Sequence, residues 1–134
     1  MITPIVRFRV DFGDEEAVGP GKIALLERID DSGSLSQAAR ELEMSYRRAW
    51  QLLESLNAAF REKVAETSKG GRGGGGAVLT PFGHELIKTY RAFERDIQAR
   101  AQRRFKPIAR RTRRESSRGK PVSVVRLSGR HSRH

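Results

Sequence analysis

The stretch from Ser45 to Leu53 constrains the fold of this chain most, because it predicts a helix with two different faces. Ser45 is a suitable N-cap, and apolar residues then recur at helical spacing over residues 45–60. The side chains on the apolar side are Ala49, Leu53, Leu56 and Phe60, flanked by Leu52 and Tyr46. A helix of this kind must pack its apolar side against other elements of a globular unit.

The opposite side of this helix is polar and basic. It carries Arg47, Gln51 and Glu54, with Arg48 and Ser55 on one flank and Trp50 on the other. An outward Arg and Gln one turn apart can make bidentate contacts with guanine and adenine, respectively. The alternative is an ordinary solvated face, which is what most charged helix faces are.

Two shorter helices are predicted upstream. Gly19-Pro20-Gly21 opens a helix over residues 22–30, in which Ile23, Leu25, Leu26 and Ile29 form an apolar side, and Ser32-Gly33 ends it. Ser34 is an N-cap with Gln37 three positions later, which is a capping-box pattern. The helix that follows leads through a tight turn at Glu43-Met44 into Ser45.

A glycine-rich hairpin is predicted downstream, between short strands at residues 64–68 and 77–80. Six of the eight residues from Lys69 to Gly76 are glycine. A phosphate-binding nucleotide loop is disfavoured, because no Gly-Lys-Ser/Thr follows and the loop enters a strand. A flexible linker is the second alternative. A hairpin tip fits better, with Lys69 and Arg72 placed to meet phosphates or a minor groove.

Residues 5–12 alternate between apolar and polar side chains, which predicts a half-buried strand. Val6, Phe8, Val10 and Phe12 share one face of this strand.

A long helix is predicted over residues 81–104. Thr80 caps it, Pro81 occupies its first position, and Pro107 ends it. An apolar stripe runs along it through Leu86, Tyr90, Phe93 and Ile97. One small domain rarely needs such a helix for its own core, so the stripe predicts dimerisation with a second copy. The alternative is that only the first turns pack and the rest frays.

Charge is distributed very unevenly along the chain. Residues 1–102 carry 15 Lys and Arg and 15 Asp and Glu, whereas residues 103–134 carry 12 Lys and Arg and one acid, Glu115. The net charge of +11 therefore belongs to the last quarter. We expect residues 105–134 to be a disordered basic tail that attracts a polyanion, or a solvated tail without a defined role.

Several classes of protein are disfavoured. The absence of cysteine excludes disulfides and thiolate chemistry. No apolar run approaches the roughly 20 residues that cross a bilayer, so we expect a cytoplasmic protein. The three histidines, His84, His131 and His134, are scattered, and no paired carboxylates or metal-ligand cluster appears. We expect no enzyme activity, no metal and no cofactor.

Helix, turn, basic helix and basic hairpin is the order of a winged helix-turn-helix. The predicted fold is therefore mainly α with a small β component, with domain 1–104 containing the dimerisation helix 81–104. Helix 45–60 would enter the major groove of double-stranded DNA, and wing 67–79 would meet the backbone or minor groove. The expected DNA-binding residues are Ser34, Ser36, Ser45, Tyr46, Arg47, Arg48, Gln51, Lys69 and Arg72.

Residues 5–97 resemble the N-terminal domain of the ModE family of molybdate-responsive transcriptional regulators, and more distantly the LysR-type DNA-binding domain. The resemblance is carried by residues 19–22, 29–30, 33–39, 44–50, 66–77 and 79–83. It implies a dimeric winged helix-turn-helix regulator of transcription, in which Ser45 to Gln51 lead the recognition helix and Arg72 lies in the wing.

The chain also departs from this family. ModE proteins carry C-terminal oxyanion-binding modules that sense molybdate, whereas a segment of about 30 residues with a basic composition follows the long helix here. We therefore expect no molybdate binding from this chain. Two other functions stay open: a non-specific nucleic-acid binder driven by the tail, and a winged helix that binds protein.

Overall fold

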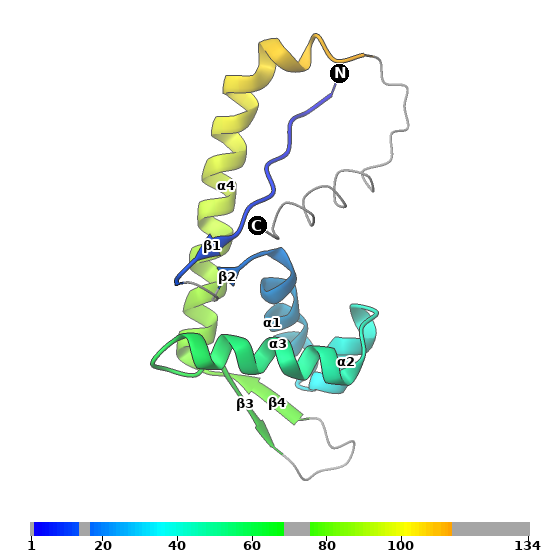
Figure 1. Ribbon diagram of the computed structural model, residues 1–134, viewed down its shortest axis with the longest axis vertical. Helices are drawn as coiled ribbons and strands as arrows, with labels where there is room; N and C mark the ends of the chain where they lie inside the picture. The colour runs from blue at the N-terminus through cyan, green and yellow to red at the C-terminus, as the bar shows by residue number, and fades with distance from the viewer. Residues whose placement is uncertain (1, 14–16, 69–75, 114–134) are drawn as a thin grey trace. The chain divides into compact units, whose positions relative to one another are not determined.

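The computed structural model describes residues 2–13, 17–68 and 76–113. Two compact units share the chain: Phe8–Phe93 forms one, and Met1–Arg7 with the part from Glu94 onward forms the other. Figure 1 labels the elements. They are β1 (Val10–Asp11), β2 (Ala17–Val18), α1 (Pro20–Ser32), α2 (Leu35–Glu41), α3 (Tyr46–Ala59), β3 (Ala65–Ser68), β4 (Gly76–Leu79) and α4 (Pro81–Ala109). The expectation of a mainly helical winged helix-turn-helix is confirmed.

Helix α1 supplies the centre of the core in the unit Phe8–Phe93. It packs against α2, α3 and β4. Its four apolar residues predicted to face inward, Ile23, Leu25, Leu26 and Ile29, are fully buried. Residues of the neighbouring elements close around them, among them Leu35, Leu53, Leu56 and Val64. Burial of these side chains fixes α2 and α3 against each other, because both present apolar faces to α1.

A two-residue junction connects α1 to α2. Gly33 adopts a left-handed conformation (φ 71°) and its N–H donates to the Ile29 carbonyl at 2.7 Å, which ends α1. Ser34 then caps α2, since its hydroxyl accepts from the Gln37 N–H at 3.0 Å. The return bond of a full capping box is absent: the Ser34 N–H donates to Ser32 Oγ, and the Gln37 side chain bonds Arg40 and Glu41 instead.

The hairpin β3–β4 forms the wing, and Figure 1 shows it beside α3. Its strands pair antiparallel from Ala65 opposite Leu79 to Ser68 opposite Gly76. Two contacts tie β4 to the junction: the Ala77 N–H donates to the Gly33 carbonyl at 3.1 Å, and Gly76 forms a β-bridge with Ser34. The base of the wing is therefore fixed to the start of α2.

The strand predicted over residues 5–12 is mostly wrong. Only Val10 and Asp11 pair with another strand, β2. The alternation is nevertheless real, since Val6, Phe8 and Val10 are half-buried and their neighbours are exposed. Phe8 stacks on the Tyr90 ring of α4 at 4.7 Å and its carbonyl accepts from the Tyr90 hydroxyl. Period-two burial arises here from contact with a helix, whereas Phe12 is half exposed.

Helix α4 is longer than predicted, because Pro107 lies inside it and the helix ends at Ala109. A proline removes the main-chain hydrogen bond from its own position and crowds the preceding turn, but it does not prevent the turn after it from forming. The last turn continues as the Arg110 N–H donates to the Lys106 carbonyl at 3.2 Å. The start agrees with the prediction, since the Thr80 hydroxyl accepts from the Gly83 N–H at 3.0 Å.

An ion pair joins the first part of α4 to α1. Arg91 donates to both carboxylate oxygens of Glu27, at 2.9 and 2.7 Å. Both side chains are largely buried, at 33% and 26% exposure. The hydrogen bonds and charge of Arg91 lower the pKa of Glu27 below its ordinary value of 4.5, although partial burial opposes this shift.

The packing of Gly83 generates a first prediction. A Cβ added to Gly83 would press on the Val64 carbonyl, whereas one added to Gly21 meets nothing within 4 Å. We expect Gly83→Ala to lower the free energy of unfolding by roughly 1–3 kcal/mol. Gly21→Ala, the matched control in α1, should leave it unchanged or raise it by up to about 1 kcal/mol. Urea titrations of both variants measure this difference; equal stabilities would contradict the close packing.

The Glu27–Arg91 ion pair generates a second prediction, which concerns how the unfolding temperature depends on pH. A carboxylate with a lowered folded-state pKa contributes stability above its ordinary pKa and loses it as pH falls through the folded value. The wild type should therefore unfold at a higher temperature than Glu27→Gln at about pH 6–8, and the gap should close as the pH falls below 4.5 and through the lowered folded-state pKa. The control is Glu62→Gln, at an exposed acid in the turn after α3. A gap independent of pH would contradict the ion pair's role.

Candidate nucleic-acid interface

The outward face of α3 is the centre of the candidate interface. Arg47, Arg48 and Gln51 are exposed, as the helical wheel predicts, while Ala49, Leu53 and Leu56 on the other side are buried. None of the three exposed side chains has a hydrogen bond or ion pair within the described part of the chain. Their donors and acceptors are therefore available to a partner. Glu54 lies one turn further along the same face and is exposed too.

Both helices of the helix-turn-helix begin with a serine cap. Ser45 Oγ accepts from the Arg48 N–H at 3.0 Å, and Ser34 Oγ plays the same part for α2. One lone pair of each hydroxyl accepts a helical N–H, and each O–H can still donate to a phosphate oxygen. Ser36, in the first turn of α2, is half-buried. Exposed N–H groups at helix starts favour anions, which suits contact with a nucleic-acid backbone.

The turn between α2 and α3 contains an unusual residue. Glu43 is the one non-glycine residue with positive φ (58°) in the described part of the chain. The Met44 N–H donates to the Ala39 carbonyl at 3.0 Å, which closes this turn. A left-handed conformation is costly for a residue with a Cβ, and glycine often takes such positions in helix-turn-helix motifs. Packing of α2 on α3 therefore holds Glu43 in a strained conformation.

The wing contributes exposed residues near its base. Glu66, Thr67 and Ser68 of β3 and Val78 of β4 are exposed, and Val78 retains 65% of its accessible surface. Lys69 and Arg72, the predicted contacts at the tip, lie outside the described residues. A Cβ on Gly76, the first residue of β4, would meet the Ser68 hydroxyl, which must turn aside to admit it.

Two exposed aromatic side chains add to the polar face of α3. Tyr46 and Trp50 retain 46% and 43% of their accessible surface. Tyr46 was among the predicted DNA contacts, whereas Trp50 was placed only on a flank of the helix. Large aromatic side chains left in water on a recognition face are candidates for apolar contacts with bases or sugars. The sequence signal for Trp50 was its position one residue before Gln51.

The stripe predicted to form a dimer divides into two parts. Tyr90 is 5% exposed in the core, and Leu86 packs against the same core. Phe93 is 46% exposed, although its ring meets Phe8 edge-on at 5.4 Å. Ile97 is half-buried. Leu86 and Tyr90 are thus used within the chain, which leaves Phe93 and Ile97 as the members with surface to offer a second copy.

The unit that carries this interface is not basic. Residues 8–93 contain 12 Lys and Arg and 13 Asp and Glu, a net charge of 12 − 13 = −1. Its few outward cations must therefore act locally, while the excess positive charge lies elsewhere in the chain.

In the part of the chain that the structure describes, no three His, Asp or Glu side chains gather as a metal site requires. No described helix is both long and apolar enough to span a bilayer.

Residues 21–84 match the family model of the bacterial regulatory helix-turn-helix protein, lysR family. The chain is 42% identical over 80 residues to the molybdenum-pterin-binding protein MopB of Rhodobacter capsulatus, which covers 60% of this chain and 30% of that protein. It is 44% identical over 71 residues to the transcriptional dual regulator ModE of Escherichia coli K12 (53% and 27%). It is 33% identical over 99 residues to the molybdenum transport protein ModE of Azotobacter vinelandii (74% and 37%).

The chain thus spans about a third of the length of these relatives, and the resemblance predicted from its motifs is confirmed over that region. Among solved structures, the crystal structure of the CbnR_DBD-DNA complex matches with a TM-score of 0.51 at 20% identity. The match covers 66% of this chain and 95% of that one, and supports the same fold.

The strained turn generates a third prediction. Glu43→Gly should unfold with a free energy about 1 kcal/mol higher than Glu43→Ala, because alanine keeps the Cβ that disfavours the left-handed region. Both variants lose the carboxylate, so the comparison isolates the backbone. Urea titration of the two proteins measures the difference. A Glu43→Ala protein as stable as Glu43→Gly would mean that the turn is not strained.

Proposed function

We propose that this chain, which carries a LysR-type helix-turn-helix domain homologous to the N-terminal region of ModE-type regulators, is a sequence-specific DNA-binding regulator of transcription. The observation that supports it most is the outward face of α3. Arg47 and Gln51 stand exposed and uncommitted one turn apart, just after the Ser45 cap. These two side-chain types read base edges in a major groove by bidentate hydrogen bonds.

The proposed mode of binding is that of other winged helix-turn-helix proteins. Helix α3 enters the major groove with its N-terminal residues against the bases, and α2 crosses the backbone. Ser34, Ser36, Ser45 and Arg48 donate to phosphates, and Tyr46 and Trp50 add apolar contacts. The wing lies on the backbone or in the minor groove, where Lys69 and Arg72 at its tip supply positive charge.

The protein acts in the cytoplasm as a homodimer, with no catalytic activity. Two copies of α3 then read half-sites about one helical turn, roughly 34 Å, or a multiple of it apart. Phe93 and Ile97 of α4 contribute to the interface between copies.

The nearly neutral charge of residues 8–93 and the net +11 of residues 103–134 favour a second candidate, a non-specific nucleic-acid binder driven by the basic tail. In this reading the basic residues after Glu94 bind nucleic acid without regard to sequence. The two functions differ in what determines affinity: α3 side chains in the first, and positive charge alone in the second.

Selection of genomic fragments by the purified full-length protein at about 0.15 M salt tests the proposal. We expect a palindromic motif to be enriched. Arg47→Ala and Gln51→Ala should each cost about 1–3 kcal/mol on a duplex carrying this motif and little on random DNA. Arg61→Ala, at an exposed cation just after α3, is the matched control and should bind as the wild type does.

Two results would reject this function. Enrichment without a motif would favour binding by charge alone. Equal losses on specific and random duplexes would show that Arg47 and Gln51 contact phosphates and do not read bases.

A further inference from the structure

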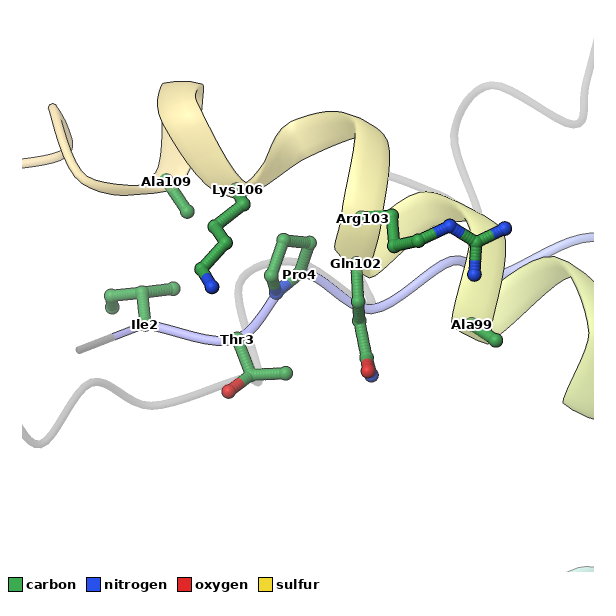
Figure 2. Close-up of a pocket in the computed structure, with 8 residues that line it drawn as sticks. All are labelled: Ile2, Thr3, Pro4, Ala99, Gln102, Arg103, Lys106 and Ala109. Carbon is green, nitrogen blue, oxygen red and sulfur yellow. The ribbon is translucent and has the colours of Figure 1, made fainter.

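We propose that residues 3–7 are a preformed strand that pairs, antiparallel, with residues 3–7 of a second copy of this chain. The inference rests on the dimer proposed above and gives that dimer a specific interface. It concerns the N-terminal segment, which Figure 2 shows running alongside the C-terminal part of α4.

The main chain of this segment is hydrogen-bonded along one edge. The Val6 N–H donates to Gln98 Oε1 at 2.9 Å, and the Val6 carbonyl accepts from Gln98 Nε2 at 2.7 Å. A residue within a β-ladder presents its N–H and carbonyl to the same neighbour in this way. The carboxamide of Gln98 therefore takes the place of a neighbouring strand, and it holds the segment extended before any partner arrives.

The other edge is free. Successive residues of an extended chain direct their main-chain groups to opposite sides, so the odd-numbered residues point away from Gln98. In the described part of the chain, the main-chain groups of Thr3, Ile5 and Arg7 have no hydrogen-bond partner. A free strand edge is a template for another strand.

Pro4 agrees with this assignment of the two edges. Proline has no N–H, so within a ladder it is confined to positions whose N–H is not needed for pairing. Pro4 is even-numbered, and its missing donor falls on the Gln98 side. The free edge keeps all its donors.

The free edge is complementary to itself. An antiparallel pair centred on Ile5 sets Ile5 opposite its own copy and Thr3 opposite Arg7 in both directions. Every main-chain donor and acceptor of the three odd-numbered residues is then satisfied, and the two arginines do not face each other. Ile5 retains 65% of its accessible surface in the single chain, and the pair brings two such side chains into contact.

A second copy suits this edge better than an unrelated peptide. The two-fold axis of the pair stands perpendicular to the ribbon, so both copies keep their even-numbered side chains on the same face. Pro4 and Val6 are half-buried, and Pro4 lines a pocket together with residues of α4. The two α4 helices would then lie under one two-stranded ribbon, where the exposed Phe105 and Ile108 gain a second helix as neighbour.

The test compares Arg7→Pro with Arg7→Ala in the full-length protein, by sedimentation velocity over a concentration series. Both variants lose the same exposed side chain, but only proline removes the N–H on the free edge. The dimer dissociation constant should rise at least about tenfold in Arg7→Pro, which removes two hydrogen bonds per dimer, and stay within about threefold in Arg7→Ala. Their helical circular dichroism should be equal.

Gln98→Met supplies an independent measurement, because it removes both bonds to Val6 while preserving side-chain length. It should also weaken the dimer at least about tenfold. Equal dissociation constants for Arg7→Pro and Arg7→Ala would overturn strand pairing, as would a monomeric wild type. Failure of the DNA-binding proposal is read separately, from the absence of an enriched motif in fragments selected by the wild type. A motif that persists with an Arg7→Pro dimer as tight as the wild type would reject strand pairing alone.

Discussion

Gly33 is the residue on which the geometry of the candidate interface depends. Its left-handed backbone ends α1, its carbonyl receives the Ala77 N–H of the wing, and the next residue caps α2. The end of the central helix, the start of the helix-turn-helix and the base of the wing thus meet within two residues. A side chain at this position would disfavour the left-handed conformation, so the relative placement of the three elements rests on the absence of a Cβ.

Local signals in the sequence predicted most of this unit. N-cap serines, a glycine after α1, the Thr80-Pro81 start and apolar spacing each act over a few residues, and the helices and hairpin form close to where those signals place them. The outward position of Arg47 and Gln51 on α3 was predictable for the same reason. Once Ala49, Leu53 and Leu56 are buried, helical geometry leaves these side chains on the opposite face.

The features that could not be predicted are those in which a sequence pattern does not determine the element that packs against it. Alternation at residues 6–10 reports that every second side chain is covered, but a helix covers Phe8 as well as a strand would. The apolar stripe on α4 predicts a packing surface but does not identify the surface that covers it. Leu86 and Tyr90 pack against the chain's own core. Likewise Gln37 has the spacing of a capping box, yet Arg40 and Glu41 compete successfully for its side chain. Such outcomes depend on competing contacts rather than on local sequence.

The division of charge has a consequence for kinetics. The unit Phe8–Phe93, with a net charge of −1, has little long-range attraction to a duplex, whereas the C-terminal quarter of the chain is strongly basic. On DNA, the basic segment would govern how often the protein arrives and how far it slides, and ionic strength would tune both. Release from the correct site would instead depend on the short-range contacts of α3. Search and residence would then be separate properties, which selection could adjust by changing different parts of the chain.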